Sequence, residues 1–157
     1  MIIRMAQESD IEDIERLLVE ICNVHSEGRP DLFKKDGKKY DKNQIKEIIN
    51  DENRPIIVAF DEENSKVLGY AMCVLQTVAN NNALCDMKTL YLDDLCVEGQ
   101  MRSNGIGKQI YDFVLEYAKK IGCYNLTLNV WECNEKAKRF YNKCGLTPQK
   151  TTLEKIL

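Results

Sequence analysis

The segment that decides the fold runs from Leu90 to Lys108 and reads LYLDDLCVEGQMRSNGIGK. Its first half, up to Val97, is apolar, β-branched and aromatic apart from two adjacent acids, which is typical of a strand. Its second half is rich in turn-forming residues, ends in Gly105-Ile106-Gly107 and opens a helical pattern. The segment therefore predicts a strand, a loop and the first turn of a helix, in that order.

The turn at the start of this helix has the character of an anion site. The first amides of a helix lack intrahelical partners and carry roughly half a positive charge, and glycine lets an anion approach them. We expect the anion to bind at Arg102, Ser103, Asn104, Gly105, Ile106 and Gly107, with Lys108 adding charge. The spacing is not that of a P-loop, which needs Lys-Ser/Thr after its second glycine, nor that of a dinucleotide fingerprint, which needs three spaced glycines.

Two stretches of the chain resemble a known family. Residues 102–107 have the form Arg-x-x-Gly-x-Gly, and residues 134–145 read NEKAKRFYNKCG. Both are similar to signatures of the GCN5-related N-acetyltransferase (GNAT) superfamily. The resemblance is strong over the C-terminal half and extends to the N-terminal half through the order of elements. It implies a mixed α/β fold with a mostly antiparallel central sheet, a splayed parallel strand pair and helices on both faces.

The same resemblance implies that acetyl-coenzyme A is the cosubstrate. Its pyrophosphate would be held by the segment from Arg102 to Lys108. Its pantetheine arm would lie between the splayed strands, against the main chain of Leu95, Cys96 and Val97, because an amide-bearing chain suits a strand edge. Asn134 would cap a helix and also contact the cofactor.

Acyl transfer to an amine requires a proton acceptor and a group that stabilises the departing thiolate. The resemblance gives the second role to Tyr141. A phenol of pKa about 10 and a thiol of about 8.5 make full proton transfer uphill by about 2 kcal/mol, so a hydrogen bond to the leaving sulfur describes the role better.

The acids nearest the predicted glycine loop are Asp93, Asp94 and Glu98. Neighbouring strand residues point to opposite faces, so Asp93 and Asp94 do not both face the substrate unless the strand contains a bulge. These three carboxylates are the candidates for the general base, and we expect Asp93 to be the one that lies on the acceptor side. The alternative is that these acids bind the substrate cation, or simply cover a strand face, without moving a proton.

Composition limits the class of protein. The 157 residues predict one domain over 1–157, and 44% apolar with 30% charged residues is typical of a globular protein. A net charge of -3 argues against nucleic acid, and no apolar run is long enough to cross a membrane. Seven scattered cysteines without a Cys-x-x-Cys pair, and a single histidine, favour reduced thiols, no metal site and a cytoplasmic location.

Hydrophobic periodicity predicts the other elements. Helices are expected at 10–24, from a Ser9-to-Glu12 capping box, then after Asp41 to about 50–53, from 106 to about 121, and after Asn134 to Gly145. Strands are expected at 1–5, 55–60, 67–78, 88–97 and 124–130, with one more strand or hairpin at 146–156. Residues 25–39 are expected to form a loop whose lysines are solvated. The strand, helix and strand from 90 to 130 have the length of a right-handed crossover, which makes the two strands parallel.

These observations lead to one main hypothesis and two alternatives. The main hypothesis is an enzyme that transfers acetyl from acetyl-coenzyme A to a primary amine of a small molecule, peptide or protein, by direct attack in a ternary complex. The first alternative is a non-catalytic acyl-coenzyme A sensor of the same fold, and the second is an unrelated nucleotide-binding domain. The acids predict a cationic acceptor, and the resemblance suggests a homodimer formed through residues 151–157.

Overall fold

The computed structural model describes all residues from 1 to 157 and contains one five-stranded sheet. The strands lie in the order in which they occur in the chain: β1 (Ile2–Met5), β2 (Ile56–Asp61), β3 (Lys66–Val78), β4 (Met87–Val97) and β5 (Asn125–Leu128). Neighbours are antiparallel from β1 to β4, and β4 and β5 are parallel. The predicted mixed α/β fold and the parallel crossover are therefore confirmed.

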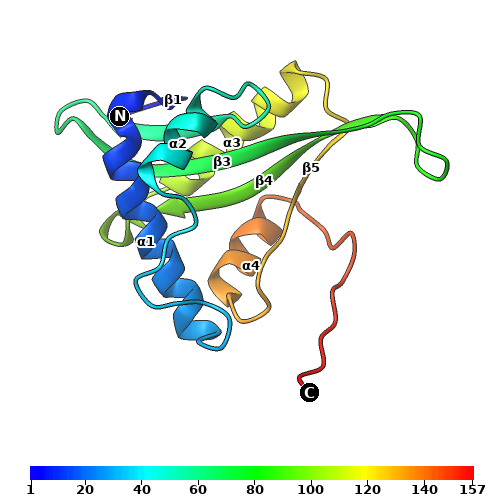
Figure 1. Ribbon diagram of the computed structural model, residues 1–157. Coiled ribbons are helices and arrows are strands. Elements are labelled where there is room, and N and C mark those ends of the chain that lie inside the picture. The colour runs from blue at the N-terminus through cyan, green and yellow to red at the C-terminus, as the bar shows by residue number, and fades with distance from the viewer.

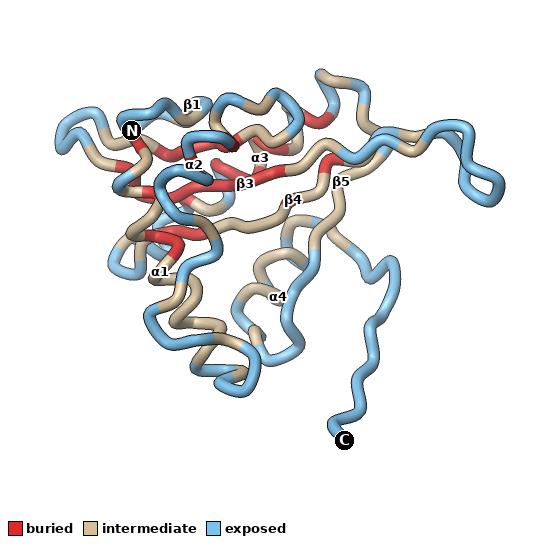
Figure 2. The backbone as a smooth tube through the Cα atoms, viewed as in Figure 1, coloured by how far each residue is buried: buried red, intermediate tan, exposed pale blue.

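Helices cover both faces of this sheet (Figure 1). The elements α1 (Ile11–Gly28) and α2 (Lys42–Ile49) pack on one face, whereas α3 (Ile106–Lys120) packs on the other, with α4 (Glu135–Lys143) beside it. Short 3-10 turns at Glu8–Asp10 and Gly99–Met101 precede α1 and follow β4. The sheet separates two apolar clusters, whose buried residues come from its strands and from the helices that pack against them (Figure 2).

The predicted start of α1 is wrong in its detail. The structure begins the helix after a 3-10 turn, in which the carboxylate of Asp10 accepts the amide of Gln7 (2.8 Å) in place of a Ser9 cap. The helix also continues to Gly28, so His25 lies in its last turns and not in a loop. The shorter helices begin where they were expected. Asp41, which precedes α2, accepts the amide of Gln44, and Asn134, the predicted cap of α4, accepts the amide of Ala137.

The C-terminal strand expected at 146–156 is absent. After Leu146, whose amide donates to the Tyr141 carbonyl (3.1 Å), no backbone hydrogen bond holds the tail, and Leu153, Ile156 and Leu157 are exposed. A strand needs a neighbouring edge and a face to bury its alternating side chains, and the tail lies away from the sheet in Figure 1. The strand predicted at 124–130 is present but shorter, Asn125–Leu128.

Several exposed parts of the chain lie outside the two clusters. The turn from 79 to 86 between β3 and β4 is exposed throughout and projects beyond the helices (Figures 1 and 2). Of the cysteines, Cys73 and Cys96 are buried, Cys85 and Cys133 are exposed, and none forms a disulfide. None of the helices combines the length and the apolar composition that a membrane span requires.

A buried ion pair fixes the start of the chain to α1, and this gives a first prediction. Arg4 donates to both oxygens of Asp10 (2.6 and 2.9 Å), whose side chain is 2% exposed. Replacing Arg4 with Met leaves a buried carboxylate without its partner, so we expect the free energy of unfolding to fall by about 3 kcal/mol. Urea denaturation measures this change.

The matched control is Lys119→Met, which removes an exposed ion pair with Glu116 on α3 (2.7 Å). An exposed pair contributes about 0–1 kcal/mol, so this variant should unfold nearly as the parent does. Equal losses in the two variants would contradict a special role for the Arg4–Asp10 pair.

Candidate active site

A bulge in β4 sets the geometry of the candidate site. Met72 pairs with Asp94 and Cys73 with Leu92, so Asp93 is an extra residue without a partner on β3. Before the bulge Leu92 points into the α3 cluster, and after it Leu95 does so, although the two are three residues apart. The odd spacing turns both Asp93 and Asp94 toward the face covered by α1 and α2.

The two acids have different partners on that face. Asp93 accepts from Lys39 Nζ (2.7 Å) and from the Tyr40 hydroxyl (3.3 Å), both in the segment between α1 and α2. Asp94 accepts from the hydroxyl of Tyr70 on β3 (2.8 Å). Burial raises the pKa of Asp94 to about 6, although the Tyr70 hydrogen bond and the charge of Lys39 act to lower it. A carboxyl with this pKa is matched to proton exchange near neutral pH.

Tyr141 lies on the other side of the end of β4. It packs edge-on against Phe140 (ring centroids 5.1 Å apart) and borders the α3 cluster, and its hydroxyl has no hydrogen-bond partner in the chain. Burial, together with the nearby charge of Asp94, raises the pKa of the Tyr141 phenol well above its ordinary value. The hydroxyl is therefore protonated at neutral pH and free to donate.

The edge of β4 is open beyond the bulge. Its pairing with β5 ends at Leu92 with Leu128, whereas β4 continues to Val97. The amide of Glu98 donates to the Leu68 carbonyl, so by the antiparallel alternation Leu95 and Val97 direct their main-chain groups away from β3, toward the gap. The main chain of Cys96 faces β3 instead, and its thiol is buried near the Leu17 carbonyl (3.6 Å).

The glycine loop exposes a row of backbone donors. The amides from Ser103 to Lys108 donate to no group in the chain, and the first amide beyond them, that of Gln109, donates to the Gly105 carbonyl (3.1 Å). The loop turns through left-handed backbone at Ser103 (φ 69°) and Gly105 (φ 79°). A run of free amides at a helix N-terminus is suited to the oxygens of an anion.

The positive side chains of this loop have partners already. Arg102 donates to the Val97 carbonyl (2.8 Å) and to Glu20 of α1 (2.6 Å). Lys108 binds Asp112 one turn along α3 (2.6 Å). Ile106 anchors the helix in the α3 cluster. Arg102 therefore positions the loop at the end of β4, and the amides provide most of the free donors.

The two remaining candidate residues, Asn134 and Glu98, support neighbouring parts of the site. Asn134 caps α4, which carries Tyr141. Glu98, the third candidate base, is held by Arg16 (2.9 Å) and Lys66 (2.6 Å), which leaves it a structural role.

His25 and Trp131 both pack on Phe33, with ring centroids 5.0 and 5.1 Å apart, and burial lowers the pKa of His25.

Three residues beside the acids were not found from the sequence. Tyr70 has the pattern of an ordinary strand residue, and its position on β3, opposite the bulged part of β4, gives no local signal. Lys39 is one of the lysines that the sequence predicts to be solvated, and Tyr40 follows the predicted loop without any functional signal of its own. A lysine next to a tyrosine just before a helix cap is too common a pattern to indicate contact with a strand fifty residues away.

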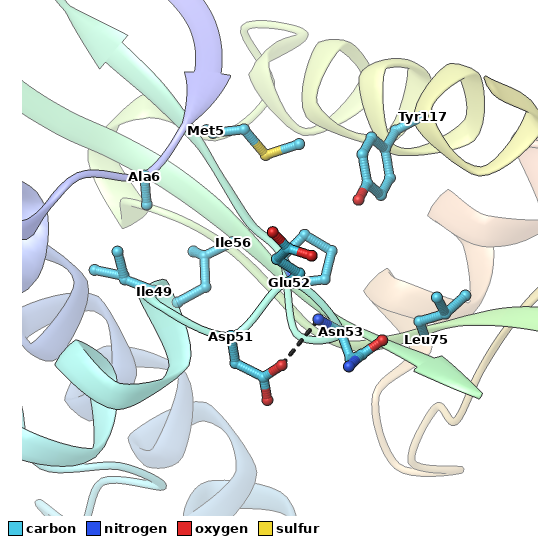
Figure 3. A pocket seen from close by; sticks show the side chains of 10 residues that line it. Met5, Ala6, Ile49, Asp51, Glu52, Asn53, Ile56, Leu75 and Tyr117 are labelled. Carbon is cyan, nitrogen blue, oxygen red and sulfur yellow. Dashed lines mark hydrogen bonds between the residues drawn. The ribbon is translucent and has the colours of Figure 1, made fainter. Parts of the chain in front are cut away.

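A cavity of about 430 Å³ lies at a different place (Figure 3). It is bounded by the end of α2, the start of β2 and the side of α3, and Figure 3 shows Tyr117 facing Glu52 and Asn53 across it. None of the candidate site residues lines this cavity.

Comparison with known proteins identifies the class to which this fold and site belong. The family model for the acetyltransferase (GNAT) family matches residues 17–146, and the chain therefore belongs to the GNAT family. Proteins of this family use acetyl-coenzyme A. The resemblance found in the glycine loop and in the Phe-Tyr segment is thus confirmed at the level of the family.

Relatives and solved structures agree with this assignment. The chain is 30% identical to a thialysine N-epsilon-acetyltransferase from Mus musculus, over 91% of this chain and 82% of the relative. It is 25% identical to a glucosamine 6-phosphate N-acetyltransferase from Arabidopsis thaliana, over 61% of this chain and 71% of the relative. A mutant of the BH1408 protein from Bacillus halodurans has a TM-score of 0.94 at 30% identity, over 100% and 99% of the two chains.

The hydrogen bond between Tyr70 and Asp94 gives a second prediction. Because this bond lowers the pKa of Asp94, Tyr70→Phe should raise that pKa above about 6. The carboxyl resonance of Asp94, followed by carbon-13 NMR during a pH titration, measures the change. Tyr91→Phe, which removes a hydroxyl bonded to Asn129, is the control and should leave the titration in place.

The sign of the accompanying stability change follows from the same pKa. The folded value of about 6 lies above the ordinary value of 3.8, so the contribution of Asp94 to stability falls as the pH rises from 3.8 through 6. In Tyr70→Phe this fall should extend to higher pH. A titration of Asp94 at its ordinary value in the parent protein would contradict the environment described above.

Proposed function

We propose that this protein is an N-acetyltransferase that moves an acetyl group from acetyl-coenzyme A to a primary amine, by direct attack within a ternary complex. The observation that carries the proposal is the run of six unpaired amides from Ser103 to Lys108 beside the open edge of β4. The amides match a diphosphate, and the edge matches an amide-bearing arm. Family membership adds independent support.

The binding residues in this proposal follow from the placement of their main chain. Leu95 and Val97 direct their free amide and carbonyl groups toward the gap between β4 and β5, where they would pair with the arm of the cofactor. The Val97 carbonyl is shared with Arg102, so Leu95 offers the less encumbered pair of groups. Cys96 would not contact the cofactor arm directly, because its main chain faces β3 and its thiol is buried. When bound, acetyl-coenzyme A supplies the acetyl thioester.

The paired acids of β4 handle the acceptor amine. An alkylammonium of pKa about 10.4 is neutral in only about one molecule in two thousand at pH 7, so a nearby proton acceptor raises the reactive fraction. Asp93, the extra residue of the bulge, would bind and orient the ammonium. Asp94, whose pKa is about 6, would accept its proton directly or through water.

Tyr141 would complete the reaction on the sulfur side. Its hydroxyl is protonated, has no partner within the chain and lies at the end of β4. A hydrogen bond from this group stabilises a developing thiolate without requiring that the proton leave the phenol. Cys96 is unsuited to a covalent intermediate, because burial raises the pKa of its thiol to about 12.

The amine class rests on the relatives. The relatives named above act on glucosamine 6-phosphate and on thialysine, both small molecules with a reactive primary amine. A primary amine on a small, polar acceptor is therefore the proposed substrate class. The carboxylates of Asp93 and Asp94 fit the cationic form of such an amine.

Two glycines that flank α3 allow a matched test of cofactor binding. Gly105 (φ 79°) precedes the helix and Gly122 (φ 75°) follows it, and a side chain at either position meets no atom within 4 Å. Gly105→Glu and Gly122→Glu therefore carry the same backbone strain, but only the first places an anion beside the free amides. We expect calorimetry to show that Gly105→Glu weakens coenzyme A binding by at least about tenfold.

In the same experiment Gly122→Glu should bind coenzyme A nearly as the parent does. Unchanged binding in Gly105→Glu would show that the amides of the loop do not bind coenzyme A. Equal weakening in both variants would point to strain in α3 and not to a lost anion contact.

Replacement of Tyr141 with Phe tests the catalytic half of the proposal. We expect turnover, measured by thiol release, to fall by about a hundredfold, while coenzyme A affinity changes little. Tyr111→Phe is the control, since Tyr111 packs on the same Phe140 ring (6.4 Å) and has no proposed role. If the parent protein binds coenzyme A but no amine causes thiol release from acetyl-coenzyme A, the protein is instead the non-catalytic sensor.

A further inference from the structure

Lys39 places a primary ammonium on the acid proposed to receive the acceptor. Its Nζ is 2.7 Å from Asp93 Oδ1, and the hydroxyl of the next residue, Tyr40, donates to the other oxygen of the same carboxylate. The Asp93 side chain is 15% exposed and that of Lys39 is 44% exposed. The cation is thus at the rim of the site, and the anion lies beneath it.

Several charged groups surround the ion pair between Lys39 and Asp93. Burial acts to lower the pKa of Lys39, but the hydrogen bond to Asp93, together with the electrostatic effects of Asp93, Tyr40 and Asp94, outweighs burial and raises that pKa. Arg54 contacts the Tyr40 ring (5.4 Å), as Lys39 does (5.7 Å), so a second cation lies near the same ring. The neighbouring Lys38 is bound to Glu15 of α1 and faces another acid.

An incoming ammonium must share or displace this partner. If it takes Asp93 alone, the ammonium of Lys39 loses its ion pair, and two like charges stand close together. If the acceptor also carries an anion near its amine, Lys39 moves from Asp93 to that anion and every charge keeps a partner. An acceptor with a second ammonium near the first gains nothing from Lys39 and is repelled by it.

We propose that Lys39 is a specificity-determining residue that favours acceptors whose amine is accompanied by a carboxylate or phosphate and disfavours polyamines. This inference rests on the proposed function and concerns the same site. It narrows the acceptor from any primary amine to amino acids and phosphorylated amino sugars as chemical classes. Asp93 recognises the ammonium, and Lys39 recognises the anion beside it.

The test uses amines that differ only in the anion. Lysine is compared with cadaverine, which has the same reactive amine and no carboxylate, and a phosphorylated amino sugar is compared with its unphosphorylated form. The kcat/KM values come from thiol release with the full chain and acetyl-coenzyme A. The variants are Lys39→Met, the conservative Lys39→Arg, and Lys35→Met, an exposed lysine of the same segment that has no ion pair.

We expect the parent enzyme to prefer, in at least one pair, the acceptor that carries the carboxylate or phosphate, by about tenfold. In Lys39→Met this preference should fall toward parity, through a higher KM for the anionic acceptor and a lower KM for the diamine. Lys39→Arg should keep the preference because it keeps the charge, and Lys35→Met should keep it because that lysine does not contact Asp93.

Other outcomes overturn the inference in distinguishable ways. A ratio that is the same in Lys39→Met as in the parent shows that Lys39 does not select the acceptor, and a parent enzyme that prefers the acceptor with the carboxylate or phosphate in neither pair contradicts the proposal. In both cases the acetyltransferase assignment stands. Absence of thiol release with all four amines overturns the inference together with the proposed function.

Discussion

The site depends on one register shift in the sheet. A single extra residue, Asp93, lets β4 leave the α3 cluster at Leu92 and return to it at Leu95, with both acids turned to the opposite face between them. In a regular strand Asp94 would share a face with Leu92 and would point into the apolar cluster under α3. Pairing with β5 also ends at Leu92, so the sheet opens where the acids appear. One irregularity thus aims the carboxylates and frees the strand edge.

Close packing holds the glycine loop at the end of this strand. A Cβ at Gly69 on β3 would lie 2.7 Å from the Cys96 carbonyl, so only glycine lets the two strands approach there. A Cβ at Gly107 would meet Val97 and Phe140 at ordinary contact distances, which shows how near the helix start lies to both β4 and α4. Arg102 then ties the loop to the Val97 carbonyl and to Glu20 of α1. The free amides are therefore presented by a supported turn.

Sequence reasoning succeeded where structure depends on near neighbours. Periodicity and local chemistry predict the strand, loop and helix from Leu90 onward, the helix after Asp41, the Asn134 cap and the parallel crossover, and all are present. It failed where the outcome depends on distant partners. Ser9 lost the capping role to Asp10, which Arg4 holds, and the expected strand at 146–156 found no edge with which to pair. The two adjacent acids allow for a bulge, but the sequence does not predict its register. Nor does it predict the partners of the acids, which lie on β3 and in the segment before α2. The roles of Asp93, Tyr141 and the loop amides stay predictions that the geometry accommodates.

The distribution of thiols over the fold has a practical use. Burial raises the pKa of Cys73 and Cys96 to about 12, so these two thiols react slowly with alkylating reagents, and Cys22, Cys123 and Cys144 are partly buried. Cys85 lies on the exposed turn that projects between β3 and β4, and Cys133 is the other exposed thiol. With Cys133 changed to serine, a maleimide dye would attach preferentially at Cys85, where it extends into solvent beyond both apolar clusters. The chain thus carries its own attachment point for fluorescence or surface immobilisation.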